Sequence, residues 1–209
     1  MMCIKERKVL AGKFNEQEKE YIRSKLLQHG KKLFGDHGLN KTTISDLTKQ
    51  VNIAQGSFYL FYKSKEELYF EILEQEESYI REELLNKVLL KEKLTRESFR
   101  TFLQQALQFL DESPILRQLF DKSTMSQLLR KLPQDKFDSN KQGDIDFLVP
   151  YIKKWQADGI MKQLSPDIIV SMIRSLIILS LQKEMIGESN YNSTMDQLIK
   201  FISEGLIND

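Results

Sequence analysis

The stretch KTTISDLTKQVNIAQGSFYLFYKSKEEL, residues 41–68, decides the fold that we predict for this chain. It holds two short helical patterns joined by a tight corner, followed by the start of a third, longer helix. Thr43 can cap a helix that begins at Ile44, and Asp46 places a carboxylate near the positive end of that helix. Asn52 tolerates the left-handed backbone conformation, so it can end the first helix and begin the turn.

The second helix is predicted over residues 54–61, with Phe58 and either Phe61 or Tyr62 packed inward. Its outward-facing residues are predicted to be Gln55, Gly56, Ser57 and Tyr59. Glycine costs roughly 1 kcal/mol relative to alanine inside a helix, so Gly56 suggests a surface that something approaches closely. Two short helices that meet at a small-residue corner form the helix-turn-helix arrangement, whose second helix lies in the major groove of DNA.

The same run resembles the DNA-binding signature of the TetR family of bacterial transcriptional regulators, which reads roughly T-x-x-x-I-A-x-x-x-G-V-S-x-G-x-x-Y-x-x-F-x-x-K-x-x-L. The matching positions are Thr43, Leu47 for Ile, Ile53 for Val, Gly56, Tyr59, Tyr62 for Phe, Lys65 and Leu68. The chain departs from the pattern at Thr48, where the family usually has Ala, at Asn52, usually Gly, and at Ala54, usually Ser. The alternative is an unrelated three-helix packing unit.

The resemblance implies an all-α protein with an N-terminal three-helix helix-turn-helix DNA-binding domain and a C-terminal helical ligand-binding and dimerisation domain. We place a flexible basic arm at 1–15, the DNA-binding domain at 16–75, and the effector-binding and dimerisation domain at 76–209. In the resembled family, a shift of a body helix tilts the helix that links the domains and changes the distance between the two heads of a dimer.

Candidate DNA contacts follow from residue chemistry. Gln55 and Ser57, with Ser45 from the preceding helix, are the expected base-edge readers, because Gln suits adenine and Ser suits either type of base. The expected phosphate contacts, which would fix the docking angle, are Thr43, Tyr59 and Lys65. Gly56 completes the predicted DNA-binding residues as a point of close approach.

Composition and charge agree with a DNA-binding head. The 209 residues are 41% hydrophobic and 29% charged, as in ordinary soluble globular proteins, and four Pro with nine Gly favour helices. Residues 1–65 carry 13 Lys and Arg against 6 Asp and Glu, whereas the remainder carries 18 against 24. This split favours a basic module that faces a polyanion, the alternative being a set of solvated lysines. The arm's Lys5, Arg7, Lys8 and Lys13 are expected to be solvated, with phosphate or minor-groove contact as the alternative.

Other classes of protein have little support. Cys3 is the single cysteine and no secretory signal is visible, so a reducing cytoplasmic location is expected. His29 and His37 have no neighbouring ligand pattern, and we expect neither a metal nor another cofactor. The usual catalytic constellations are also missing, so an enzyme is not expected.

Along the rest of the chain, the sequence predicts mainly helices. The first covers residues 16–37 and ends at Gly35 to Gly38. The helix that Ser64 and Glu67 would cap continues past Glu83, where the charge changes sign, and a connection is predicted at 87–93. A polar loop is predicted at 134–143. The remaining helices are predicted to start at Thr95, to pass through 116–129 as one helix or a pair, and to cover 144–157, 168–186 and 193–206.

Aromatic and methionine residues at helical spacing in the body usually indicate a core. In a TetR-like body they also suggest an apolar ligand pocket, whose candidate walls are Phe102, Phe109, Met125, Phe147, Tyr151 and Trp155. The Tyr151 hydroxyl and the Trp155 ring NH would supply its few polar contacts. The small-molecule effector itself is not identified by the sequence.

The segment 168–186 is apolar nearly all round, and its uncharged part, 175–182, is far shorter than the ~20 residues that a membrane span needs. No membrane partner is therefore expected. A helix that is apolar on several faces must be buried on several faces. In the resembled family the last two helices form a four-helix dimer interface, with packing inside a monomer as the alternative. The predicted contacts of a homodimer are Ile169, Ile173, Leu176, Leu198 and Ile202.

We therefore expect a transcriptional regulator, a repressor that binds a palindromic double-stranded DNA operator as a homodimer and is released by a small, largely apolar effector. Two alternatives remain open. The body could answer to a protein partner instead of a ligand, or the chain could be a helical ligand-binding protein with a vestigial DNA-binding head.

Overall fold

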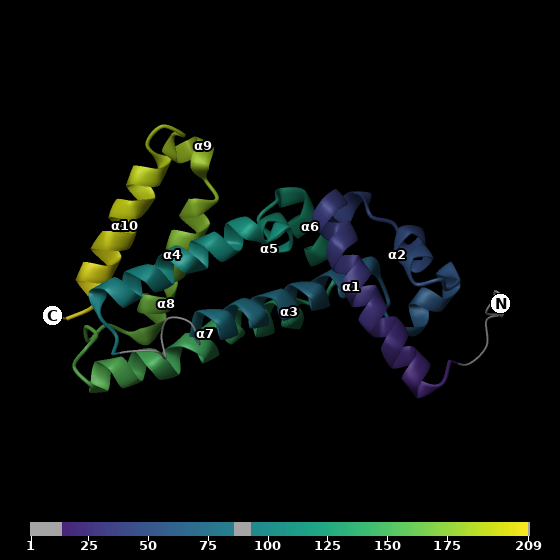
Figure 1. Cartoon of the computed structure of the whole chain (residues 1–209), viewed down its shortest axis with the longest axis horizontal. Helices are drawn as coiled ribbons and strands as arrows, with labels where there is room; N and C mark the ends of the chain where they lie inside the picture. The colour runs from purple at the N-terminus through teal and green to yellow at the C-terminus, as the bar shows by residue number, and fades with distance from the viewer. Residues whose placement is uncertain (1–13, 86–92, 209) are drawn as a thin grey trace, which may run out of the picture. The chain divides into compact units, whose positions relative to one another are not determined.

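The computed structural model describes residues 14–85 and 93–208, and within these ranges the chain is built from helices (Figure 1). The elements are α1 (Glu16–Lys41), α2 (Ile44–Gln50), η1 (Gln55–Leu60), α3 (Lys65–Leu84), α4 (Arg96–Glu112), α5 (Pro114–Leu119), α6 (Lys122–Lys131), α7 (Gln134–Ala157), α8 (Pro166–Ser180), α9 (Lys183–Ile186) and α10 (Tyr191–Leu206). The predicted all-α class is confirmed. The arm residues 1–13, with Cys3, and most of the predicted connection at 87–93 lie outside the described residues.

Two compact units share the chain. The first contains residues 1–75 and 121–132, and the second contains 76–120 and 133–209. Helix α6 belongs to the first unit, although its sequence lies inside the segment 76–209 that we predicted as the body. Helix α3 contributes its first half to the first unit and its second half to the second. The chain passes between the units at three places, within α3 and at both ends of α6.

The core of the first unit forms where α3 packs against α1. Phe34 and Tyr69 are fully buried and meet edge to face, with ring centroids 5.3 Å apart. Gly30 allows the helices to approach closely, because a Cβ there would lie 3.0 Å from Ile72 Cδ1 and 3.3 Å from Leu68 Cδ2. This packing brings the start of α3 beside the corner formed by α2 and η1.

The start of the corner between α2 and η1 agrees with the prediction from the sequence. Thr43 and Asp46 form the predicted capping box of α2, and Asn52 adopts a φ of 55°, in the left-handed region. The second helix is shorter and tighter than predicted, since η1 is a 3₁₀ helix of six residues. Ala54 has no side chain that can cap it, and the amide of Ser57 donates instead to the Ala54 carbonyl in a tight i+3 bond of 2.9 Å.

Helix α1 ends its regular path where the sequence predicted. Gly38 has a φ of 80°, which interrupts the helical dihedrals before the last residues of α1. Thr42 then closes the end, because its backbone amide and its hydroxyl both donate to the Gly38 carbonyl. The chain is thereby turned into α2 at a defined position.

In the second unit, helices α4, α7, α8 and α10 surround one apolar core. Phe99, Leu103, Ile152 and Ile169 are buried at its centre. The chain end is held by backbone bonds, from Lys162 N to Leu206 O at 2.8 Å and from Asn208 N to Ile160 O at 2.8 Å. An isolated antiparallel bridge joins Met161 and Ile207.

The polar segment 134–143 is not a loop, and this prediction is wrong. It forms the first part of α7, which runs from Gln134 to Ala157. Phe137 is only 8% exposed, so one apolar residue anchors this turn of the helix. Asn140 Nδ2 donates to Glu77 Oε2, which satisfies a polar side chain on the inner side. Tertiary contacts therefore override a composition that is typical of a loop.

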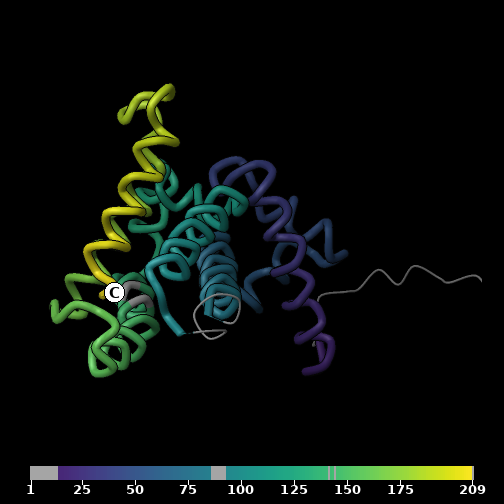
Figure 2. Tube along the Cα trace, turned by 60° about the vertical axis from the view of Figure 1, so that its left-hand side comes forward, coloured from purple at the N-terminus to yellow at the C-terminus, as the bar shows by residue number. Residues whose placement is uncertain are grey.

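Helix α8 also ends earlier than predicted, at Ser180 instead of at residue 186. The Tyr191 hydroxyl donates to the Ser180 carbonyl at 2.8 Å and occupies an acceptor that helix continuation would need. The chain turns through α9, and Gly187 has a φ of 97° before α10 begins (Figure 2). Among the described helices, none is long and apolar enough to cross a membrane.

Candidate nucleic-acid interface

The first predicted contact, Thr43, lies exposed at the start of α2. Its hydroxyl donates to Asp46 Oδ2 at 2.6 Å, and the two backbone amides complete the reciprocal cap at 3.0 and 3.2 Å. These hydrogen bonds from Thr43 lower the pKa of the Asp46 carboxyl. The cap therefore fixes the orientation of α2 at the point where it would meet a phosphate backbone.

The surface of η1 presents a small set of residues. Gln55 and Gly56 are exposed, Tyr59 is 57% exposed and Leu60 is 66% exposed. Ser57 was predicted on this surface, but it is only 9% exposed, so its outward placement is wrong. The tight winding of η1 turns Ser57 inward with Phe58 and exposes Leu60 in its place, which the sequence analysis had missed.

Lys65 does not point towards an external phosphate. Its ammonium donates to the carbonyls of Leu39 at 2.7 Å, Asn40 at 3.3 Å and Thr42 at 2.8 Å. Burial lowers the pKa of Lys65, an effect that the neighbouring Glu66 carboxylate partly opposes. The expected phosphate contact is therefore corrected to a structural role, since Lys65 closes the end of α1 beside the corner.

Three lysines near the helix-turn-helix remain exposed. Lys41 ends α1, Lys49 lies in the last turn of α2, and Lys63 follows η1. They provide the positive charge that Lys65 does not offer. Ser45, the third predicted base reader, is partly buried on α2.

Tyr62, which follows η1, lies in a cluster with residues of α1 and α3. Arg23 Nη2 lies 2.7 Å from Glu71 Oε2, and the Arg23 guanidinium lies 5.6 Å from the centroid of the Tyr62 ring. Burial raises the pKa of Tyr62, with a further rise from Glu71. The cluster connects α1 and α3 with the residues that follow η1.

Helix α6 is bonded into the first unit by polar contacts that the sequence analysis did not find. Gln127 Nε2 donates to Glu66, a carboxylate that is only 4% exposed. Asn40 Nδ2 donates to Ser123 Oγ at 2.8 Å. These pairs are 61 and 83 residues apart in the chain, and no local pattern signals them.

Five of the six candidate pocket residues lie in or against one apolar core, and Met125 does not. Met125 belongs to α6 in the first unit, whereas the other five belong to the second, so its inclusion is wrong. Phe102 and Trp155 are buried in the core of the second unit, and Phe147, Tyr151 and Phe109 pack against that core. The ring centroid of Tyr151 lies 6.0 Å from that of Trp155 and 6.2 Å from that of Phe147, distances that are typical of ordinary aromatic packing.

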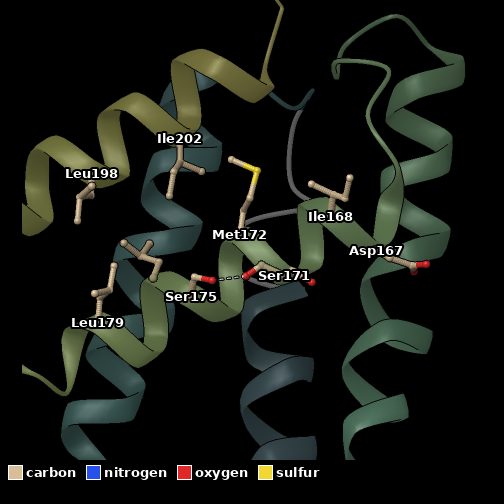
Figure 3. Close-up of a pocket in the computed structure, with 9 residues that line it drawn as sticks. Asp167, Ile168, Ser171, Met172, Ser175, Leu179, Leu198 and Ile202 are labelled. Carbon is tan, nitrogen blue, oxygen red and sulfur yellow. Dashed lines mark hydrogen bonds between the residues drawn. The ribbon is translucent and has the colours of Figure 1, made fainter.

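A groove lies instead between α8 and α10 (Figure 3). Its lining residues are Asp167, Ile168, Ser171, Met172, Ser175, Leu176, Leu179, Leu198 and Ile202. Two predicted dimer contacts, Ile169 and Ile173, are instead buried in the core of their own chain. Leu176 is buried in the same core and also lines the groove with Leu198 and Ile202, which remain predicted dimer contacts.

We expect replacement of Gly56 by alanine to separate stability from DNA binding. A Cβ at this position would meet no atom within 4 Å, and Gly56 is not among the described glycines with a positive φ. Neither packing nor backbone strain requires a glycine, so stability should stay level or rise by up to about 1 kcal/mol. If DNA approaches the backbone here, affinity for the operator should fall about tenfold, or about 1.4 kcal/mol.

Thermal unfolding and a DNA titration of Gly56→Ala check both expectations. Gly143→Ala is the matched control, because an added Cβ there makes only ordinary contacts of 3.7 and 3.9 Å with Arg81. Unchanged DNA affinity of Gly56→Ala would remove this position from the contact surface.

Comparison with known proteins finds a family match within the first unit. Residues 26–72 match the family model described as bacterial regulatory proteins, tetR family. The regulator QacR of Staphylococcus aureus is 35% identical over 86 residues, which cover 41% of this chain and 45% of QacR. The chain thus spans about half the length of the curated relatives that it matches.

Two solved structures share the fold over nearly the whole chain. A TetR-family transcriptional regulator from Pectobacterium atrosepticum has a TM-score of 0.70 at 20% identity, covering 94% of this chain and 99% of the other. SmeT, the repressor of the multidrug efflux pump SmeDEF of Stenotrophomonas maltophilia, has a TM-score of 0.63 at 18% identity, covering 90% and 91%. Residues 26–72 thus match the tetR family of bacterial regulatory proteins, and the chain shares the fold of solved regulators of that family.

Proposed function

We propose that this protein is a transcriptional regulator and not an enzyme, acting in the cytoplasm as a repressor that reads a palindromic DNA operator. The observation that carries the proposal is the exposed surface of η1, supported by the capped helix α2 and by the Lys65 clamp. Gln55 is the main base-edge reader, Ser45 assists it, and Thr43 and Tyr59 hold phosphates. The family match of residues 26–72 and the repressor named among the related structures support the repressor role.

The proposed operator is palindromic because two copies of the chain would bind it through a two-fold axis. The groove between α8 and α10 supports a dimer, since both of its helices expose apolar side chains. Ile168 is 53% exposed, Leu179 is 41% exposed and Phe201, on α10, is 60% exposed. A second copy that packs on these two helices would cover them and form a four-helix interface.

A small, largely apolar effector is proposed to release the protein from DNA. A change in the second unit can reach the first through the continuous helix α3 and through both ends of α6, where the chain passes between the units. The Glu66–Gln127 pair then connects α6 to the first turn of α3. Through each of these connections, effector binding in the second unit would change the position of η1.

A second candidate is release by a protein partner. The observation that favours it is the packing of Phe102 and Trp155 in the core of the second unit, where we had expected pocket walls. Screening small apolar compounds for a change in thermal stability and in operator affinity separates the two candidates. A compound that raises stability and weakens DNA binding supports the effector.

Selection of random duplex DNA on the purified protein tests the DNA-binding proposal. We expect a two-fold symmetric consensus whose affinity falls steeply with salt, because several phosphates are contacted. Gln55→Ala should then relax the preference at one base pair of each half-site, by about 1–3 kcal/mol. Weak binding without any enriched sequence would support the alternative of a vestigial head.

A further inference from the structure

Leu60 has no role in the core, although Phe58 of the same element is buried. Its side chain is 66% exposed, whereas Phe58 is fully buried and Tyr62 is 5% exposed. Burial of a leucine side chain stabilises a folded protein by about 1.5–3 kcal/mol, and the exposed Leu60 does not contribute this free energy to folding. A single exposed leucine is not unusual, and its meaning depends on the surface that it shares.

The surface that Leu60 shares with its neighbours has an unusual chemistry for a DNA reader. Residues 54–61 contain no lysine, arginine, aspartate or glutamate. Arginine or lysine bound to guanine O6 and N7 is the commonest base-specific contact, and η1 cannot supply it. The nearby exposed cations, Lys49 and Lys63, lie outside η1, where they suit phosphates.

The exposed groups of η1 match the two bases of an A·T pair. The Gln55 amide can donate to and accept from the adenine edge, and the Leu60 isobutyl group suits the 5-methyl group of thymine. This methyl group is presented only in the major groove, which is where the second helix of a helix-turn-helix lies. Gly56, next to Gln55 in the chain, adds open space to this surface, since no atom lies within 4 Å of its Cβ position.

We propose that η1 reads an A·T-containing core in each half-site and that Leu60 contacts the methyl group of a thymine there. This inference rests on the proposed function, which it makes more specific. Leu60 is then a specificity-determining residue that acts through desolvation of a methyl group and not through hydrogen bonds.

Uracil substitution tests the contact, because deoxyuridine differs from thymidine only by the missing methyl group. In the selected operator, each thymine is replaced in turn by uracil and the affinity is measured for the full-length protein. One position per half-site should lose about fourfold in affinity, which corresponds to about 0.8 kcal/mol for one buried methyl group. Leu60→Ala should bind the thymine and uracil operators equally well, as a double-mutant cycle requires.

Two further variants control the experiment. Leu60→Met keeps an apolar chain of similar volume and should retain the methyl dependence. Tyr59→Phe removes only a neighbouring hydroxyl and should also retain it. Because Leu60 is exposed, Leu60→Ala should show an unchanged melting temperature, which separates lost contact from lost folding.

The possible outcomes distinguish this inference from the proposed function. An enriched palindrome with no methyl-dependent thymine, or with a dependence that Leu60→Ala retains, overturns the role of Leu60. An enriched half-site that has only G·C pairs in its core overturns the A·T reading. Failure to enrich any sequence overturns the DNA-reading function and this inference with it.

Discussion

Replacement of Phe201 by aspartate is expected to separate the proposed dimer into monomers and to lower operator affinity about 100-fold or more, or about 2.7 kcal/mol. Phe201 is 60% exposed on α10, next to Ile202 of the groove between α8 and α10. In a two-fold symmetric interface each substitution occurs twice, so two carboxylates would enter the apolar contact. Burying an unpaired carboxylate is costly, and the monomers should separate.

The loss of DNA affinity follows from the loss of the dimer. A monomer must bind each half-site independently, without the high effective concentration that a linked second head provides. Sedimentation velocity measures the oligomeric state, and a DNA titration at fixed salt measures the affinity.

Phe120→Asp is the matched control for Phe201→Asp. Phe120 is also an exposed phenylalanine of the second unit, at 41%, and it follows α5 instead of lying on α8 or α10. Its replacement should leave the dimer intact. A Phe201→Asp protein that stays dimeric with unchanged operator affinity would show that the partner does not pack on α10.

The local parts of the fold were accessible from the sequence because their causes are local. Thr43 and Asp46 are three residues apart, and the same short-range logic places the start of α4 at Thr95, where Thr95 and Ser98 form a capping box. Asn52 in the left-handed region likewise depends only on its own side chain. The starts of α2 and α4 and the corner of the helix-turn-helix were therefore predicted correctly.

Errors arose where a residue's role depends on the face that it presents. Ser57 was predicted to face outward but is buried, and the exposure of Leu60 was not predicted, because η1 winds more tightly than an α-helix. Ile169 and Ile173 satisfy the apolar pattern equally well inside their own core or in a dimer, and the pattern cannot tell these apart.

Long-range contacts were beyond any local pattern. Met125 was assigned to the body by its position in the chain, yet α6 is part of the first unit. The polar run 134–143 became helical because Phe137 and Asn140 find partners in the folded chain. The exposure of Gln55, Gly56 and Tyr59 was therefore predicted correctly, whereas the contacts between distant segments were not predicted.

Lys65→Ala is the second substitution with a large expected effect. If Lys65 contacted DNA, its removal would weaken DNA binding and leave stability unchanged, whereas removal of a structural clamp lowers stability. The ammonium donates to three backbone carbonyls between Leu39 and Thr42, just before α2. Its removal leaves these acceptors without a charged donor, and hydrogen bonds to charged groups contribute about 1.5–3 kcal/mol each. We therefore expect the free energy of unfolding of the first unit to fall by about 2–3 kcal/mol.

Chemical denaturation and hydrogen exchange of the amides of α1 and α2 measure this loss. Lys63→Ala is the matched control, because Lys63 is an exposed lysine two residues away whose loss should leave stability unchanged. If Lys63 contacts a phosphate, its removal should lower the slope of affinity against salt by about one charge. The opposite pattern, with stability lost only at Lys63 and the salt slope changed only at Lys65, would return Lys65 to the phosphate contacts, because a side chain used by DNA cannot at the same time close the end of α1.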